Sequence, residues 1–424
     1  MRTGRLFFVA FMLIVSACVS KESIVIPPAK PFDHPQLSNL SAQEIQAHGD
    51  TIIFGKNKKY TNDNIKIVYL QGSPFEIGYA HGKLMKNEIE DHVKFWLHYG
   101  KLRFLGTNYG INLLKERAKE VEQHIPSEYL EELHGISVGS NLDYDTLLGI
   151  NAMSTTAYSF GGHGCTSFAF KDQQSNIVRS RNLDWPTGST RDFFSGETVY
   201  IVKPDSGFGF ISVNRPGWID AMTAMNEMGL TFGDHGLVGF RQKTWNKIPQ
   251  NFLHRKVIQY SRTIDDAEEQ VKQHKPYTIA LFLVSSKSDA AVFEMANDKF
   301  ARIDMEDGYL ALSNHARELH SRKWDDTIDR LDLANEYLKR NLESMNIEKA
   351  VYLNRTQPIS RSEYGGRNRH SVIFSSNELN FWIAKPKEPE EIPACYGTYT
   401  GFNLLKELYG QGHDPDPPFF PAKE

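Results

Sequence analysis

The spacing of apolar residues changes from helical to strand-like near residue 161, and that change constrains the fold more than any other feature. Between residues 72 and 150 apolar side chains recur at helical intervals, beginning at Phe75 and Tyr79. The stretch opens with SPFE at 73–76, where a serine, a proline and a returning glutamate make a capping box. After Gly161 the period becomes two, which is typical of strands. We therefore expect helices before this point and mostly strands after it.

Two blocks of short alternating runs, separated by polar turns, predict the strands. The runs lie at 165–170, 177–181, 198–203, 208–213, 219–225 and 229–233, and then at 278–284, 290–295, 300–305 and 309–313. Further helices are expected at about 111–123, 251–274 and 325–341. Strand blocks that alternate with helices favour an α+β fold, in which two antiparallel sheets pack together with helices outside as a four-layer αββα sandwich.

The composition excludes several classes of protein. The chain of 424 residues has 48 basic and 52 acidic side chains, and its net charge of −4 argues against nucleic acid as a partner. Its 40% apolar content is that of a globular protein rather than a disordered one. Three cysteines are too few for a disulfide framework, so each cysteine needs its own explanation.

Common cofactor motifs are missing from the sequence. It contains no P-loop, GxGxxG, HExxH or CxxC pattern, and His315 and His320 are spaced for different faces of a helix. We therefore expect no metal and no other cofactor. The run GISVG at 135–139 matches the GxSxG nucleophile pattern, but it follows a helical stretch where that pattern requires a strand. Ser137 is accordingly expected to have a structural role.

The first residues form a candidate targeting signal. Two arginines precede an apolar run at 6–15, which is shorter than the roughly 20 residues that span a bilayer. The ending VSAC resembles the bacterial lipobox, which implies removal of residues 1–17 and a lipid anchor on Cys18 that holds the protein at a membrane of the bacterial cell envelope. A plain secretory signal is the alternative. Residues 18–65, which are rich in proline at their start, are expected to form a tether and N-terminal extension.

Cys165 lies at the start of the first predicted strand, and Arg181 lies on the strand that returns beside it. A thiol is nucleophilic only as a thiolate, and a nearby guanidinium lowers the pKa of a thiol. The predicted hairpin can bring Arg181 back to Cys165. A buried cysteine that only packs is the alternative reading.

Five ordered motifs resemble those of a known family. GCTSF at 164–168 and RNLDW at 181–185 resemble the N-terminal-nucleophile cysteine hydrolases, which include choloylglycine hydrolase, penicillin V acylase, acid ceramidase and isopenicillin N acyltransferase. GSPFEIGYAHG at 72–82 is similar to the acyltransferase branch, and MNEMGL at 225–230 and LSNH at 312–315 resemble two further motifs. The resemblance runs from about residue 66 to the end of the sequence. The five motifs identify the family specifically, but they say little about the substrate.

The resemblance implies that the chain cuts itself between Gly164 and Cys165. Cys165 would then carry the thiol nucleophile together with an α-amine, whose ordinary pKa of about 7.7–8.0 suits a general base. By the same resemblance Arg181 would polarise the thiol and Asp184 would hold the α-amine. Asn314 would stabilise the oxyanion of the tetrahedral intermediate.

For three other groups, the resemblance assigns residues to roles less definitely. The late arginine of the family falls on Arg367 or Arg369, of which Arg369 is preferred. The second oxyanion donor falls on Asp234 or His235. Cys395 lies in the C-terminal segment and is expected to pack.

These observations predict an enzyme made as a proenzyme. Residues 66–164 would form a helical segment that stays associated with a catalytic domain at 165–424. The expected reaction is cleavage of a small-molecule N-acyl amide, a linear amide, through an acyl-thioester on Cys165. The alternatives are an acyltransferase that passes the acyl group to an amine, a peptidase or self-processing protein, and a non-catalytic surface-binding lipoprotein with the same fold.

Overall fold

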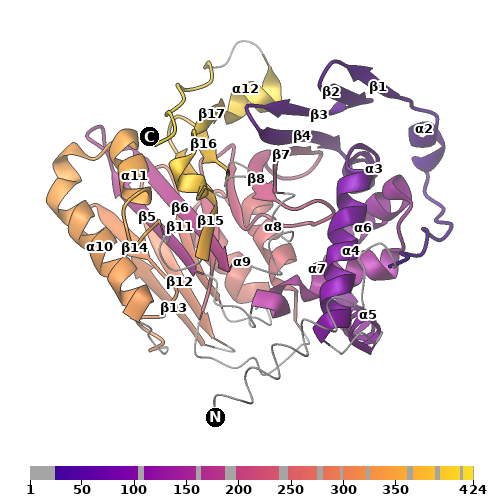
Figure 1. Cartoon of the computed structure of the whole chain (residues 1–424), viewed down its shortest axis with the longest axis horizontal. Helices are drawn as coiled ribbons and strands as arrows, with labels where there is room; N and C mark the ends of the chain where they lie inside the picture. The colour runs from indigo at the N-terminus through magenta and orange to yellow at the C-terminus, as the bar shows by residue number, and fades with distance from the viewer. Residues whose placement is uncertain are drawn as a thin grey trace.

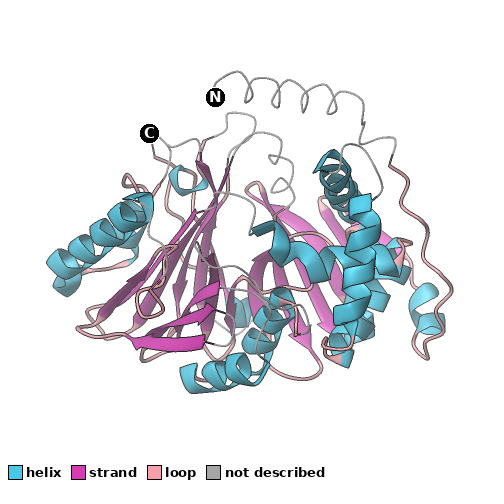
Figure 2. Ribbon diagram, turned by 90° about the horizontal axis from the view of Figure 1, so that it is seen from below, coloured by secondary structure: helices cyan, strands magenta, loops and turns pink. Residues whose placement is uncertain are grey.

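The computed structural model describes residues 24–103, 109–158, 164–186, 197–237, 247–274, 280–296, 299–320, 325–360, 366–386, 392–410 and 414–423. Two sheets lie face to face, and helices cover the outer side of each sheet (Figure 1 and Figure 2). The fold is therefore the α+β, four-layer αββα sandwich that the sequence predicts. The expected signal peptide at 1–17 and the expected anchor at Cys18 lie outside the described residues.

The smaller sheet carries the strand that begins at Gly164. Its described strands are arranged in the order β14-β5-β6-β15-β16-β17, and all neighbours are antiparallel. The bounds are β5 Gly164–Lys171, β6 Ile177–Pro186, β14 Tyr309–Leu312, β15 Gly366–Ser375, β16 Asn380–Ala384 and β17 Thr400–Asn403. Strands β5 and β6 form the predicted hairpin, and helices α10 (Asp325–Asn341) and α11 (Ile347–Asn354) pack against this sheet. The sequence patterns did not predict β15, β16 and β17.

The larger sheet has the order β1-β2-β3-β4-β7-β8-β9-β10-β11-β12-β13 within the described residues. Its strands are β1 Ile45–His48, β2 Thr51–Phe54, β3 Asn57–Asn62, β4 Ile65–Gly72, β7 Thr198–Pro204, β8 Phe210–Asn214, β9 Thr223–Asn226, β10 Thr231–Gly236, β11 Ala280–Ser285, β12 Ala290–Ala296 and β13 Lys299–Asp304. Strands β4 and β7 are parallel, so the expectation of wholly antiparallel sheets is wrong at this pair. The intervening helices provide the long crossover that parallel neighbours need.

Helices cover the outer side of the larger sheet. Helix α3 (Pro74–Leu84) packs on β4, α8 (Gln250–Tyr260) on β9 and β10, and α9 (Ile264–His274) on β11 and β12. The remaining helices are α2 Leu37–Ser41, α4 Lys86–Arg103, α5 Tyr109–Glu122, α6 Ser127–Ser140, α7 Tyr144–Tyr158 and α12 Leu404–Tyr409. The predicted capping box opens α3, because Ser73 and Glu76 each accept a hydrogen bond from the other's backbone N–H. Of the helices described, none is long and apolar enough to cross a membrane.

Residues 24–65 pack against the domain, which differs from the tether expected for them. Ile24 is buried, and the Phe32 ring stacks on His134 of α6 with 4.0 Å between ring centroids. Strands β1, β2 and β3 extend the larger sheet beyond β4 (Figure 1). The proline-rich composition suggested a free spacer because it carries no signal for these long-range contacts.

Helices α3 and α6 approach so closely that their backbones touch. A Cβ added at Gly78 or Gly82 of α3 would lie within 3.0 Å of backbone atoms of α6, and one at Gly135 or Gly139 of α6 would lie as close to α3. The GISVG run is therefore a packing motif within a helix, as expected. Ser137 lies in that helix and donates to the carbonyl oxygen of Leu142 at 2.6 Å.

We predict that Gly139→Ala destabilises the protein by about 1–3 kcal/mol, because the added methyl group overpacks the contact between α3 and α6. Gly149→Ala in α7 is the matched control, since its Cβ would crowd only the end of the Leu114 side chain, with the nearest backbone atom at 3.9 Å, and its gain in helix propensity is the same. Denaturant unfolding of the two variants measures the difference. Equal free energies of unfolding would show that the two helices do not depend on this contact.

Candidate active site

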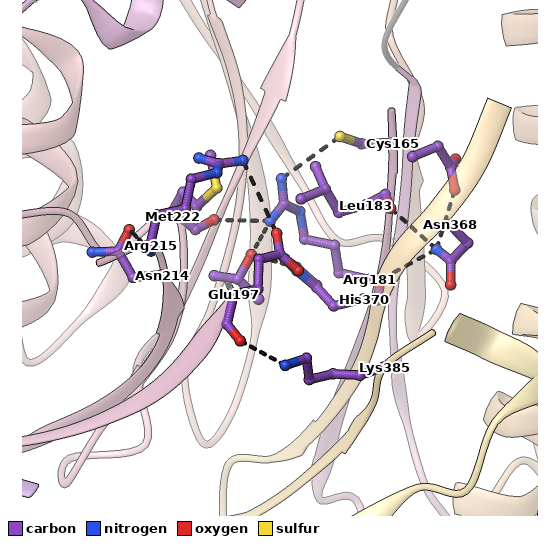
Figure 3. Close-up of polar contacts among 12 residues, drawn as sticks. Cys165, Arg181, Leu183, Glu197, Asn214, Arg215, Met222, Asn368, His370 and Lys385 are labelled. Atoms are coloured by element: carbon purple, nitrogen blue, oxygen red, sulfur yellow. Dashed lines mark hydrogen bonds and ion pairs between the residues drawn. The ribbon is translucent and has the colours of Figure 1, made fainter. Parts of the chain in front are cut away.

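Cys165 is the second residue of β5 and is buried. Nη2 of Arg181 lies 3.6 Å from its Sγ, as the predicted hairpin requires (Figure 3). Burial raises the pKa of the Cys165 thiol, while the Arg181 guanidinium opposes the shift and the carboxylates of Asp184 and Asp234 add to it. In the uncut chain the sulfur is thus held as a thiol next to the cation that can stabilise its thiolate.

Arg181 joins the two sheets. It belongs to β6 of the smaller sheet, but its guanidinium donates to three oxygens that belong to β9, to β10 and to the residue before β9. These acceptors are the backbone oxygen of Met222 at 3.1 Å, the hydroxyl of Thr223 and the backbone oxygen of Asp234. The side chain is fully buried, so a cation here needs these partners. The hydrogen bonds fix the guanidinium where it meets the sulfur of Cys165.

Asn314 lies against the same cysteine. Its Oδ1 accepts a hydrogen bond from the backbone N–H of Cys165 at 2.7 Å, and its Nδ2 donates to the backbone oxygen of Gly236 at 2.9 Å. The predicted proximity of Asn314 to Cys165 is therefore present. In this geometry, however, the amide holds the nitrogen that self-cleavage would turn into the α-amine, rather than presenting a donor to an oxyanion.

Arg330 completes the described polar contacts of Cys165, and no sequence motif marked it. From helix α10 its Nη1 donates to the backbone oxygen of Cys165 at 2.5 Å and to Oγ1 of Thr166 at 2.8 Å. A weak signal for it exists in the sequence. Thr327 and Ala334 are buried, and their helical spacing places Arg330 on the same buried face.

Glu294 anchors the loop that follows Asn314. This buried carboxylate of β12 accepts hydrogen bonds from three consecutive backbone N–H groups, those of Arg317 at 2.6 Å and of Glu318 and Leu319 at 2.9 Å each. The loop is therefore fastened to the larger sheet just beyond Asn314. No sequence motif pointed to this residue, because its partners are backbone groups.

Asp184 lies opposite Gly164 in the pairing of β5 with β6. It is fully buried, and its Oδ1 accepts a hydrogen bond from Nδ2 of Asn368 at 3.1 Å. The structure thus places the carboxylate beside the expected cleavage point. Its predicted contact with an α-amine concerns the cut chain and stays a prediction.

The catalytic role expected for the late arginine, at Arg367 or Arg369, stays a prediction. Arg369 is buried at the irregularity in the pairing of β15 with β6, between Asn368 and His370, and the side chain of Arg367 lies outside the described residues. The described side-chain contacts of Cys165 come from Arg181, Asn314 and Arg330. Arg330 therefore supplies the second cation at this cysteine, at a position that the family motifs did not mark.

Asp234 and His235 do not present donors to Cys165. The backbone N–H of Asp234 donates to the oxygen of Met222 at 3.1 Å, and Nε2 of His235 lies 2.7 Å from Oγ of Ser167. Burial and the nearby Arg181 lower the pKa of His235, so its ring is neutral. Burial raises the pKa of the Asp234 carboxyl to about 6, against the attraction of His254 and Arg181. The expectation of a second oxyanion donor here is therefore not met in the uncut chain.

Cys395 is buried in a short 3₁₀ turn (Ala394–Tyr396), and it and Cys165 are free thiols. Its backbone N–H donates to Oδ1 of Asn368 at 2.7 Å, and burial raises the pKa of its thiol well above the usual range. Packing, as predicted, is the role that this environment suits. Within the described part of the chain, no group of three or more His, Cys, Asp or Glu side chains is arranged to hold a metal ion.

Comparison with known proteins matches residues 172–380 to the family described as acyl-coenzyme A:6-aminopenicillanic acid acyl-transferase. An uncharacterised protein of Archaeoglobus fulgidus is 28% identical over 400 residues, which cover 82% of this chain and 64% of that protein. The 40 kDa form of acyl-coenzyme A:6-aminopenicillanic-acid-acyltransferase of Emericella nidulans is 27% identical over 177 residues, covering 41% of this chain and 43% of that protein. The matches thus span less than two thirds of the length of these relatives.

Among solved structures, the Caenorhabditis elegans ortholog of N-acylethanolamine-hydrolyzing acid amidase is similar with a TM-score of 0.42 and 12% sequence identity. The similarity covers 50% of this chain and 93% of that chain.

We predict that Asp234→Asn makes the protein more stable than the wild type at neutral pH but not in acid. The pKa of the folded carboxyl, about 6, lies above the ordinary value of 3.8, so its stabilising contribution is complete below pH 3.8 and is lost as the pH rises through 6. An asparagine cannot ionise and avoids this loss, which is at most about 3 kcal/mol. Denaturant unfolding of the two proteins from acid to neutral pH measures the difference, and a difference that does not change with pH would contradict the prediction.

Proposed function

Because the chain belongs to the acyltransferase branch of the N-terminal-nucleophile cysteine hydrolases, we propose that it is an enzyme activated by cleavage of its own chain before Cys165. The activated enzyme cleaves linear N-acyl amides of small molecules. The observation that carries the proposal is that the sulfur, the nitrogen and the carbonyl oxygen of Cys165 each have a side-chain partner. A cysteine that only packs has no need of three such partners.

Self-cleavage begins when Sγ of Cys165 attacks the carbonyl carbon of Gly164. The C–N bond between the two residues then breaks, a thioester forms at the sulfur, and the nitrogen gains a proton to become the α-amine. Water hydrolyses the thioester and frees the thiol and the carboxyl group of Gly164. Oδ1 of Asn314 supports this path because it already accepts a hydrogen bond from the leaving nitrogen at 2.7 Å.

The same groups serve the reaction with substrate. The free α-amine of Cys165 removes the thiol proton, and Arg181 stabilises the thiolate, which attacks the amide carbonyl. The amine part of the substrate leaves with a proton, and water attacks the acyl-thioester to release the acid. Arg330 holds the carbonyl oxygen of Cys165 at 2.5 Å and so keeps the nucleophile in register with β5.

Transfer of the acyl group to an amine is a second candidate function. The description of the matched family and of the Emericella nidulans relative as acyltransferases favours it. Hydrolysis and transfer share the acyl-thioester and differ in whether water or an amine attacks it. A binding protein that keeps the fold without turnover, or a protein whose only reaction is its own cleavage, would form no acyl-thioester from an added amide.

The lipid anchor on Cys18 and a location at a bacterial membrane form part of the same proposal. They rest on the sequence of residues 6–18 alone. Replacing Cys18 by serine in the full chain tests them, because a lipid-anchored protein would then leave the membrane fraction.

We predict that the purified chain separates into two pieces on a denaturing gel and that the larger carries residues 165–424, which is 260 residues (424 − 164) with Cys165 first. The variant Cys165→Ala should remain whole and should release no acid from a panel of N-acyl amides, because it lacks the sulfur that forms the thioester. An added amine that diverts product from free acid to a new amide would identify the acyltransferase.

Cys395→Ala is the matched control, since it removes the other described free thiol and should be cut normally. Mass spectrometry of the pieces locates the cut. A wild-type chain that stays whole and still hydrolyses amides would contradict the proposed activation.

We further predict that Arg330→Met slows self-cleavage by about tenfold or more, because it removes the charged donors that hold the Cys165 carbonyl oxygen and Asn314. Arg340→Met on the same helix is the control. Arg340 is largely exposed and pairs with Glu336 one turn away, so its loss should leave the rate unchanged. The fraction of cut chain over time gives both rates, and equal rates would show that Arg330 has no part in cleavage.

A further inference from the structure

A line of buried hydrogen bonds leads from Arg181 away from Cys165. Arg181 donates to the hydroxyl of Thr223, and this oxygen lies 3.1 Å from Nε2 of His370. On the other side of the ring, Nδ1 of His370 lies 3.0 Å from Oε2 of Glu197 (Figure 3). The line therefore joins a carboxylate next to β7 to the guanidinium that touches the nucleophile.

One arrangement of protons fits every link. Arginine can only donate, so the Thr223 oxygen accepts from Arg181 and its O–H is left to donate to Nε2 of His370. The single proton of the neutral imidazole then lies on Nδ1 and is donated to Glu197. All the hydrogen bonds thus run in one direction, from Arg181 toward Glu197. With a neutral imidazole, reversing any one of them would leave two donors or two acceptors facing each other.

The charges of the site agree with this arrangement. Burial lowers the pKa of His370, as do Arg181 and Arg215, and these outweigh the opposite effect of Glu197, so the ring is neutral. Burial raises the pKa of Glu197, but His370, Arg215 and Lys385 outweigh it and leave the pKa lowered, so the carboxylate is charged. A charged acceptor and a neutral ring are what the proton arrangement requires.

The line lies in the interior throughout. Arg181, Thr223 and His370 have no exposed surface, and Glu197 is 3% exposed. They come from β6, β9, β15 and the residue before β7, so both sheets contribute. Glu197 is also held by Nη2 of Arg215 at 4.0 Å and, through its backbone oxygen, by Nζ of Lys385 at 2.6 Å. A buried carboxylate fixed in this way is a rigid end point for the line.

We propose that Glu197, His370 and Thr223 are positioning residues that hold the Arg181 guanidinium against the sulfur of Cys165. The inference deepens the proposed function by adding three residues to its machinery, and it rests on Cys165 being the nucleophile. Of the oxygen acceptors described for Arg181, the Thr223 hydroxyl is the only one on a side chain; the other two are the backbone oxygens of Met222, just before β9, and of Asp234 on β10. The hydroxyl is thus the acceptor whose direction other side chains set, and its loss would loosen the cation from the thiolate.

The test measures the pKa of the Cys165 thiol, which does not depend on turnover. The ultraviolet absorbance of the thiolate is followed against pH, and the signal of the Cys165→Ala variant is subtracted. Thr223→Val removes the hydroxyl at constant shape and should raise the thiol pKa by about one unit, which means about tenfold less thiolate at a pH below both values. Thr223→Ser keeps the hydroxyl and should titrate like the wild type.

Thr231→Val is the matched control for a purely structural effect. Thr231 lies on the neighbouring strand β10, is equally buried, and its hydroxyl meets Oγ of Ser285 at 2.7 Å outside the line. This variant should lose stability as Thr223→Val does, but its thiol pKa should not move. Glu197→Gln keeps the shape of the side chain and removes its charge, and it should raise the thiol pKa by less than Thr223→Val does. If Thr223→Val does not fold, Glu197→Gln tests the same inference.

The outcome separates this inference from the proposed function. If Thr223→Val and Glu197→Gln leave the thiol pKa of the wild type unchanged, the positioning role is wrong, whether or not the chain cuts itself. If the thiol pKa shifts as expected but no self-cleavage or amide cleavage is found, the line positions Arg181 and the proposed function is wrong.

Discussion

The contact between the Arg181 guanidinium and the larger sheet is the interaction on which the site depends. The side chain starts from the smaller sheet and ends among Met222, Thr223 and Asp234 of the larger one. A fully buried cation between two sheets is unfavourable unless its donors find acceptors, and here Nη1 and Nη2 of the residue from one sheet find them at the other. The packing of the sheets and the placement of the cation beside Cys165 therefore have the same cause.

Cys165 is held from three directions by parts of the chain that are far apart in sequence. Arg181 on β6 meets its sulfur, Asn314 after β14 meets its nitrogen, and Arg330 on α10 meets its oxygen. Asn314 and Arg330 are also hydrogen-bonded to each other at 3.0 Å. This geometry belongs to the uncut chain, in which the Cys165 nitrogen is still an amide, and it explains why Asn314 presents its oxygen rather than its nitrogen to the cysteine.

Local patterns predicted much of the fold and the central pair of the site. The period of two placed β5 and β6, and because Ser167 lies opposite Arg181 in this hairpin, Cys165 and Arg181 are diagonal neighbours on one face. Arg330 escaped prediction because an arginine in an amphipathic helix usually faces solvent. Strands β1 to β4 pair with their neighbours in sequence, but they escaped because the prolines at 27–35 led the segment up to residue 65 to be interpreted as a tether. The positions of Asp234, His235 and Arg369 depend on how the two sheets meet, which no local pattern encodes.

The parallel pairing of β4 with β7 gives self-cleavage a consequence for folding. Strand β4 precedes the Gly164–Cys165 bond and β7 follows it, yet Ile67 pairs with Val199 and Leu70 with Val202 inside one sheet. Cutting the bond would leave two polypeptides as neighbouring strands of that sheet, and separating them would expose two unpaired strand edges. Folding, a unimolecular process in the precursor, would become bimolecular in the cut protein. The midpoint of reversible unfolding would then depend on protein concentration only after the cut.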